Sequence, residues 1–106
     1  MARRREQLGW AEPALLILTS LASGPKHGYL IIKDVHDDAE VTLGPGTLYA
    51  ALARLEESGL VEPLAGDERR RPYRITAPGQ KVLSERLATM SRFAATGLAR
   101  IAGAQA

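Results

Sequence analysis

The chain has 106 residues, of which 45% are hydrophobic and 25% are charged, and its formal net charge is +2. This length predicts a single domain with a modest core, and this composition argues against an intrinsically disordered chain. The chain contains no cysteine, which excludes disulfides and thiolate metal sites. The small net charge does not select a partner, but arginines are concentrated in two clusters, Arg3–Arg5 and Arg69–Arg71.

Residues 1–12 are predicted to form a charged N-terminal arm. The Arg3–Arg5 cluster within it is expected to be a solvated tail, with contact to a phosphate backbone as the alternative. These arginines, followed by the apolar run Ala14–Leu21, also resemble a secretory signal peptide. We reject that interpretation because Glu12-Pro13 interrupts the approach to the run, which is too short for a membrane span of ~20 residues. We therefore expect a cytoplasmic protein with no membrane partner.

Two helices are predicted in the first half of the domain. The first covers about Pro13–Ala22 and is apolar around most of its circumference, which is typical of a helix buried on several sides. Ser23–Pro25 ends it. The second covers about Gly28–Val35 and is expected to end there, because the following Asp37-Asp38 is unfavourable at a helix C-terminus. Glu40–Leu43 contains β-forming residues and is compatible with a very short strand.

A third helix, within Gly44–Leu60, has both of its ends marked in the sequence. Pro45 suits the first helical position, and Ser58-Gly59 supplies a left-handed exit. Leucines at 48, 52 and 55 form one apolar stripe, while the opposite face is small, polar and basic. A helix that presents such a face is typical of the recognition helix of a DNA-binding helix-turn-helix.

The early residues of a recognition helix meet base edges in the major groove. Thr47, Tyr49 and Arg54 are therefore candidates for direct contact, with Arg54 able to donate two hydrogen bonds to a guanine. The alternative for Arg54 is a solvated helix residue paired with Ser58 or a nearby glutamate. The alternative for Tyr49 is a ring that packs on the following hairpin while its hydroxyl reaches a phosphate.

The start of the second helix is a candidate phosphate site. Lys26, His27 and Tyr29 lie there, where backbone N–H groups and the helix dipole favour an anion. For His27, a plain role as a helix-start residue is almost equally well supported.

A basic hairpin is predicted after the third helix. Its strands are Leu60–Leu64 and Arg71–Thr76, joined by Ala65–Arg70, and Pro63 indicates an edge strand. A hairpin in this place is typical of the wing of a winged helix. The candidates for contact with flanking phosphates or a minor groove are Arg69, Arg70, Arg71 and Arg74, with a solvated loop as the alternative.

The last helix is predicted over roughly Gly79–Ile101. Its apolar residues recur at three- and four-residue spacing, and a helix of ~22 residues is about 33 Å long, more than a small domain can cover. We therefore expect it to pair with the same helix of a second subunit. The predicted dimer interface comprises Leu15, Leu18, Leu83, Leu87, Met90, Phe93, Ala94, Leu98 and Ile101. Met90 and Phe93 could instead line an effector pocket.

At this point the chain resembles the PadR family of transcriptional regulators. The resemblance rests on LASGPKHGY, on LGPGTLYAALARLEESGLV, on RRRPYRITAPG and on the terminal helix, and it covers nearly the whole chain. The length of the chain is similar to that of the short PadR subgroup, whose members have a single C-terminal helix. Two departures are Gly44, where the family often has Ser, and Ala50, where Pro often follows the Tyr.

The resemblance implies a mainly α, winged helix-turn-helix fold with a two-stranded β-wing and a long C-terminal dimerisation helix. It implies a homodimer that binds double-stranded operator DNA, usually as a repressor, and often one that responds to small aromatic or drug-like molecules. We assign residues 1–12 to the arm, 13–77 to the DNA-binding domain and 78–106 to the dimerisation helix.

Other chemistries are less well supported. The Gly44-x-Gly46 pair lacks the third glycine and the βαβ unit of a dinucleotide site. His36, Asp37, Asp38 and Glu40 do not have the spacing of a standard metal site. No Ser/His/Asp grouping places a nucleophile on a recognisable turn. We therefore expect no enzyme, cofactor or metal, and the competing hypothesis is a winged-helix module that binds another protein through its long helix.

Overall fold

The computed structural model describes residues 12–67 and 70–105. Its elements in chain order are α2 (Pro13–Leu21), β1 (Lys26–His27), α3 (Gly28–Ala39), α4 (Pro45–Glu57), β2 (Val61–Pro63), β3 (Pro72–Ile75) and α5 (Ala77–Gln105). The strands form one antiparallel sheet in the order β1-β3-β2. The predicted mainly helical fold with a β-hairpin wing is therefore confirmed. None of the helices in these described residues combines the length and apolar character needed to cross a bilayer.

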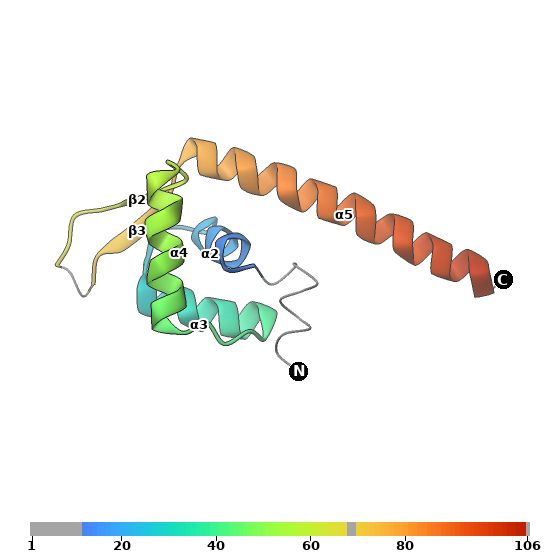
Figure 1. Cartoon of the computed structure of the whole chain (residues 1–106), viewed down its shortest axis with the longest axis horizontal. Coiled ribbons are helices and arrows are strands. Elements are labelled where there is room, and N and C mark those ends of the chain that lie inside the picture. Colours follow the sequence, from blue (N-terminus) through green and yellow to red (C-terminus); the bar gives the residue numbers. More distant parts are fainter. Residues whose placement is uncertain (1–11, 68–69, 106) are drawn as a thin grey trace.

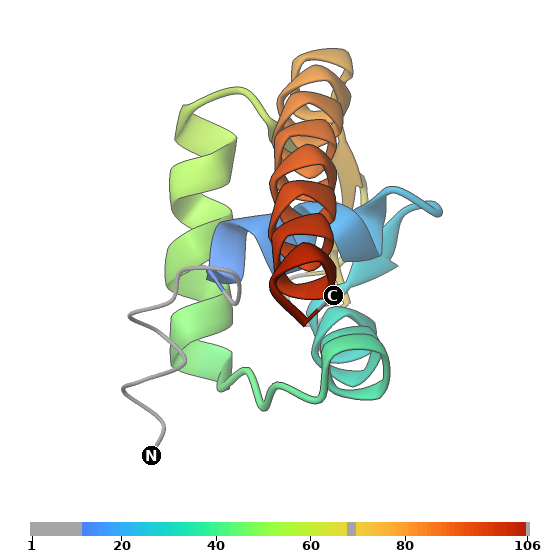
Figure 2. The ribbon, with the colours of Figure 1, turned by 90° about the vertical axis from the view of Figure 1, so that its right-hand side faces the viewer.

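The core lies where α2, α3 and α4 meet the inner face of the sheet (Figure 1). The run Leu15–Leu18 on α2 is buried along its length, as expected of a helix that is apolar on nearly every side. Ile31 of α3 and Leu48 and Leu52 of α4 are fully buried against it. Figure 2 shows α5 crossing over α2. The position of α2 at the centre of this packing agrees with its prediction as a helix buried on several sides.

The helix α3 continues to Ala39, so the predicted end near Val35 is wrong. Val35 is buried and Ala39 is half-buried, so the extra turn buries apolar surface. The charge of Asp37 near the helix end is compensated by Lys33, whose Nζ lies 2.9 Å from Asp37 Oδ2. Glu40 then ends the helix in a left-handed conformation with φ of 56°.

The segment 40–43, which was compatible with a short strand, has no strand conformation in the structure. It is the connection between α3 and α4, and Leu43 within it is buried in the core. Leu43 therefore anchors a loop to the core, and none of the strands in the described part of the chain pairs with this segment.

Both ends of α4 agree with the prediction. Gly44 is the N-cap, and its carbonyl accepts the backbone hydrogen bond of Leu48 at 2.9 Å. Gly59 follows the helix with φ of 75°, and the N–H of Leu60 bonds back to the carbonyl of Leu55 at 2.9 Å. This turn directs the chain from α4 into β2.

The sheet has one strand more than the predicted two-stranded wing. Residues Lys26–His27 form β1 and pair with β3 in the register Lys26 to Tyr73 and His27 to Pro72. A two-residue strand carries too little pattern to be predicted from sequence. The prediction of Pro63 as an edge-strand residue is confirmed, because β2 lies at the outer edge of the sheet.

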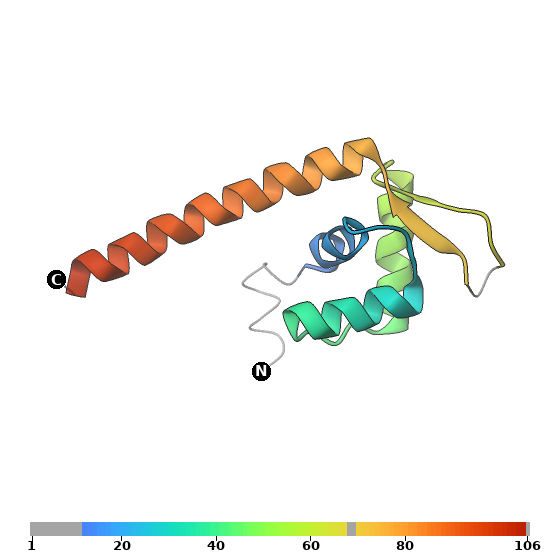
Figure 3. The same cartoon turned by 180° about the vertical axis from the view of Figure 1, so that it is seen from behind.

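The last helix, α5, is longer than predicted at both ends and contains 29 residues. Gly79 and Leu83 are buried against the domain, whereas the described side chains of 84–104 are exposed apart from half-buried Gly97. Figure 3 shows α5 leaving the sheet beside the end of α4 and extending past the rest of the described chain. Gly97 and Gly103 do not end the helix, which continues beyond its predicted end at Ile101 to Gln105.

Candidate nucleic-acid interface

The outer face of α4 carries the predicted base-contacting residues. Thr47, Tyr49 and Arg54 are all exposed, while the leucines of the opposite face are buried in the core. Within the described residues, the Arg54 side chain makes no hydrogen bond or ion pair, and its only bond to Ser58 runs from the Ser58 N–H to the Arg54 backbone carbonyl at 3.0 Å. Its guanidinium is therefore free to meet an external acceptor.

The ring of Tyr49 lies across the start of α3. A Cβ atom added to Gly28 would lie 2.9 Å from Tyr49 Cζ and closer still to the hydroxyl oxygen. Gly28 therefore leaves room for this ring, which remains 46% exposed. Tyr49 thus joins α4 to the start of α3.

The side chain of Lys26 is directed into the domain, contrary to the predicted phosphate contact. Its Nζ donates to the carbonyl of Ser20 and to Ser23 Oγ at 2.6 Å, and lies 3.1 Å from Asp34 Oδ2. The Lys26 side chain is only 15% exposed. We therefore leave Lys26 out of the proposed DNA interface, because its charge is already balanced and its donors are satisfied.

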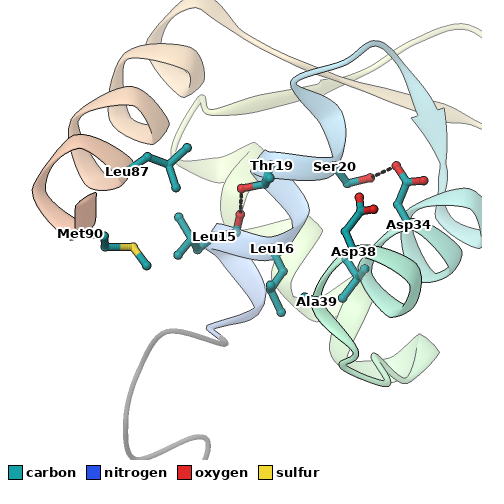
Figure 4. Close-up of a pocket in the computed structure, with 10 residues that line it drawn as sticks. Leu15, Leu16, Thr19, Ser20, Asp34, Asp38, Ala39, Leu87 and Met90 are labelled. Atoms are coloured by element: carbon teal, nitrogen blue, oxygen red, sulfur yellow. Dashed lines mark hydrogen bonds between the residues drawn. The ribbon is translucent and has the colours of Figure 1, made fainter. Parts of the chain in front are cut away.

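Asp34 is the partner that holds Lys26 in place. It also accepts a hydrogen bond from Ser20 Oγ at 2.9 Å, shown as a dashed line in Figure 4. The hydrogen bond from Lys26, and next that from Ser20, holds the pKa of Asp34 below its ordinary value. This network ties β1 to the end of α2 and to the middle of α3. The sequence did not predict it, because Ser20, Lys26 and Asp34 are far apart in the chain.

His27 and Tyr29 remain beside the interface. His27 is the N-cap of α3, without a hydrogen bond from its side chain to the helix, and pairs with Pro72 at the base of the wing. Tyr29 lies in the first turn of α3 and is 72% exposed. Because Gly28 contacts Tyr49 and His27 adjoins β3, the start of α3, the recognition helix and the wing converge on one side of the molecule (Figure 1).

The tip of the wing is closed by a turn that leaves its arginines outside. The N–H of Arg70 donates to the backbone and side-chain oxygens of Asp67 at 3.1 and 2.9 Å, and Leu64 N–H bonds to the Pro72 carbonyl at 2.8 Å. Arg70 and Arg71 are exposed. Predicted Arg69 lies outside the described residues, as do residues 1–11 of the arm with the Arg3–Arg5 cluster.

Arg74 has a partner within the sheet. Its guanidinium pairs with Glu62, which lies opposite it on β2. This ion pair compensates the charge that the prediction assigned to DNA contact, so we leave Arg74 out of the proposed contacts. The cross-strand pair stabilises the hairpin that carries them. Burial, followed by the nearby Glu56 carboxylate, raises the pKa of Tyr73 on the same strand.

The predicted dimer residues separate into two groups. Leu15, Leu18 and Leu83 are already buried within one chain, so they have little surface left for a partner. The other six are exposed, namely Leu87, Met90, Phe93, Ala94, Leu98 and Ile101. Phe93 and Leu98 are 79% and 69% exposed, which is unusual for apolar side chains this large.

A groove of about 210 Å³ lies where α5 passes α2. Figure 4 shows Leu87 and Met90 of α5 facing Leu15 of α2, while Leu16 points toward Ala39 of α3, and Asp34 and Asp38 lie on the α3 side. The groove is largely apolar with acidic groups at one end. Of the two residues predicted as alternatives for an effector pocket, Met90 lines it and Phe93 does not.

The described surface offers exposed cations, backbone amides and a small-residue helix face. Among the residues that the structure describes, no three His, Asp or Glu side chains gather as metal ligands would. Such a surface can bind an extended anion.

Comparison with known proteins agrees with this arrangement. The sequence pattern of the PadR-like family matches residues 17–85. A PadR family transcription regulator from Clostridium difficile superposes with a TM-score of 0.71 at 30% identity, covering 84% of this chain and 96% of that one. A transcriptional regulator from Clostridium thermocellum superposes with a TM-score of 0.68 at 32% identity, covering 76% and 83%.

A further relative is an uncharacterised 37.1 kDa protein of transposon TN4556 from Streptomyces fradiae, 44% identical over 78 residues. The match covers 74% of this chain but spans only 23% of that protein. The family match covers more than half of the chain, and it includes the recognition helix, the wing and the start of α5. This chain therefore belongs to the PadR-like family of transcriptional regulators, a DNA-binding family whose members are regulators and not enzymes.

Proposed function

We propose that this chain is a homodimeric, sequence-specific DNA-binding repressor that acts on a palindromic operator in the cytoplasm. One observation carries the proposal. The exposed face of α4, where the Arg54 side chain is unpaired, lies on the side of the molecule where the start of α3 and the wing also meet. A major groove accepts an α-helix, and the flanking phosphates are then within reach of a basic hairpin.

The contacts divide by role. Thr47 and Arg54 of α4 read base edges, Arg54 through a guanine. Tyr29, His27 and the Tyr49 hydroxyl position the start of α3 on a phosphate. Arg69, Arg70 and Arg71 at the wing tip bind flanking phosphates or a minor groove, which strengthens binding to every sequence.

Dimerisation follows from the exposed apolar stripe of α5. Residues 78–106 supply the dimerisation helix and residues 13–77 the DNA-binding unit. Pairing the stripe with its copy about a two-fold axis covers Phe93, Leu98 and Ile101 and presents two recognition helices to successive major grooves, roughly 34 Å apart.

A small effector would act through the α2–α5 groove. Its apolar walls suit an aromatic or drug-like molecule, and the Asp38 carboxylate at its edge suits one that also carries a positive charge. A ligand there would shift the direction of α5 relative to α2, and operator affinity would change by as much as the ligand prefers one arrangement.

Direct binding measurements test the proposal. The full chain is titrated with fluorescent duplexes that carry either an inverted repeat recovered by selection or random sequence, at about 50 and about 200 mM salt. We expect tighter binding to the repeat and weaker binding of both at the higher salt. A protein-docking module that does not bind DNA predicts no affinity for either duplex and would overturn the proposal.

The variant Arg54→Ala separates base reading from charge. It should weaken binding to the repeat by about 1–3 kcal/mol, and binding to random DNA far less. Equal losses on both duplexes would mean that Arg54 contacts the backbone.

A further inference from the structure

The beginning of α5 is hydrogen-bonded to the turn that ends the recognition helix. The hydroxyl of Thr76 donates to the carbonyl of Gly59 at 2.6 Å, and the N–H of Thr76 donates to the carbonyl of Leu60 at 3.0 Å. The same hydroxyl oxygen accepts the N–H of Gly79 at 3.1 Å. One side chain thus caps α5 and holds it to the exit of α4.

Close backbone packing reinforces this junction. A Cβ atom added to Gly79 would overlap the carbonyl of Leu60 and would lie 2.8 Å from Ile75 Cγ1. The first turn of α5 therefore lies directly on the Gly59–Leu60 turn. We name the contact between Gly59–Leu60 and Thr76–Gly79 the α4–α5 junction.

The junction lies at one end of a long lever. Further along α5, Leu83 is buried and Arg86 pairs with Glu12 at 2.9 Å, but the described side chains beyond are mostly exposed. At 1.5 Å per residue, the 29 residues of α5 extend about 43 Å. A rotation of about 5° at the junction displaces the far end by roughly 4 Å, comparable to the 3.4 Å between successive base pairs.

We propose that Thr76 is a positioning residue that sets the spacing of the two DNA half-sites. It does so by fixing the direction of the dimerisation helix relative to the recognition helix within each subunit. The proposal rests on the proposed function, because it requires an α5-mediated dimer that binds two half-sites. It assigns Thr76, which lies outside the DNA-facing surface, to operator selection and not to base reading.

Three substitutions separate the two bonds of the Thr76 hydroxyl. Thr76→Ser keeps both bonds. Thr76→Val removes both while preserving side-chain shape and the backbone bond to Leu60. Thr76→Asp keeps an acceptor for the Gly79 N–H, since Asp is a good N-cap, but an ionised carboxylate cannot donate to the Gly59 carbonyl.

The experiment measures affinity of the full-length variants for duplexes built from a half-site recovered by selection. One duplex carries a single half-site, and the others carry inverted repeats with centre-to-centre distances of about 8 to about 13 base pairs. We expect the wild type and Thr76→Ser to prefer one spacing about tenfold over spacings two base pairs away. Thr76→Val and Thr76→Asp should reduce that preference to about threefold or less, with single half-site affinity changed by less than about twofold.

An unchanged spacing profile in Thr76→Asp would overturn the proposal, even if Thr76→Val unfolds. A loss of single half-site affinity in parallel with spacing preference would also overturn it, because Thr76 would then only support the fold. Failure of the proposed function can be told apart from failure of the Thr76 proposal, because in that case the wild type itself would bind no duplex or would show no spacing preference.

Discussion

Two regions of this chain differ in how their apolar residues are covered. In the winged-helix unit, α2, α3, α4 and the sheet bury one another's leucines and isoleucines. In the distal part of α5, Phe93, Leu98 and Ile101 are exposed along one stripe. The first region is held together by its own contacts. A helix that projects without tertiary contacts is marginal in water, which is why we propose that the second region is covered by a partner.

The largest expected effect tests the join between the two regions. Gly79→Ala should destabilise the protein by roughly 3 kcal/mol or more, because its Cβ overlaps the Leu60 carbonyl, a backbone atom that has little freedom to move. Gly103→Ala is the matched control, since a Cβ there meets no atom within 4 Å, and it should be neutral or slightly stabilising. Urea unfolding at fixed protein concentration measures both, and equal stabilities would refute the close packing of the junction.

The next prediction concerns a substitution that should prevent the distal part of α5 from pairing with a second subunit. Phe93→Glu should weaken dimerisation about 100-fold, because it places a charge where a large apolar side chain would be buried between subunits. The winged-helix unit of the Phe93→Glu variant should keep its secondary structure. Ala99→Glu places the same charge on the opposite face of α5 and should leave the dimer intact. Sedimentation velocity over a concentration series distinguishes them, and a stable Phe93→Glu dimer would mean that the interface lies elsewhere.

A third prediction concerns the Lys26–Asp34 network within the first region. Lys26→Met should reduce stability at neutral pH by about 1–2 kcal/mol, because Asp34 loses its ionic partner. The folded-state pKa of Asp34 is lowered, so its stabilising contribution is present above the unfolded pKa of about 3.9 and is lost as pH falls through the folded value.

The stability difference between wild type and Lys26→Met should therefore be constant near neutral pH and shrink below about pH 4. Unfolding curves across this range measure it. The salt dependence of DNA affinity should stay the same in this variant, and a slope lowered by about one would return Lys26 to the DNA contacts.

The smallest effect is expected at the wing tip. Arg70→Ala should weaken binding to all DNA sequences about equally and lower the slope of log affinity against log salt by about one. Lys81→Ala, which removes an exposed charge from α5, is the matched control and should keep the wild-type slope. The same slope in both variants would exclude the wing from the phosphate contacts.

The elements that the sequence predicted best have strong local signals. The ends of α4 agree with the structure because Pro45 and Gly59 have backbone preferences that few contexts override. The extension of α3 was missed because burial of its last turn outweighs an unfavourable acidic end, and that burial depends on neighbours distant in sequence.

The sequence predicted the elements that carry the candidate site, but the structure corrected the directions of some of its side chains. Thr47, Tyr49 and Arg54 are all exposed on α4, as expected from their positions outside its leucine stripe. Periodicity could not show that Lys26 turns inward to Asp34 or that Arg74 pairs with Glu62, because both partners are brought close by tertiary folding. The double role of Thr76 likewise depends on a turn 17 residues earlier.

The measurement that most directly tests the division into a DNA-reading unit and a dimerising helix is selection of binding sites from a random DNA pool with the purified full chain. We predict enrichment of an inverted repeat whose half-site centres lie about one helical turn apart. Enrichment of single, unpaired half-sites would contradict the dimer that α5 is proposed to form, and no enrichment at all would contradict sequence-specific recognition by α4.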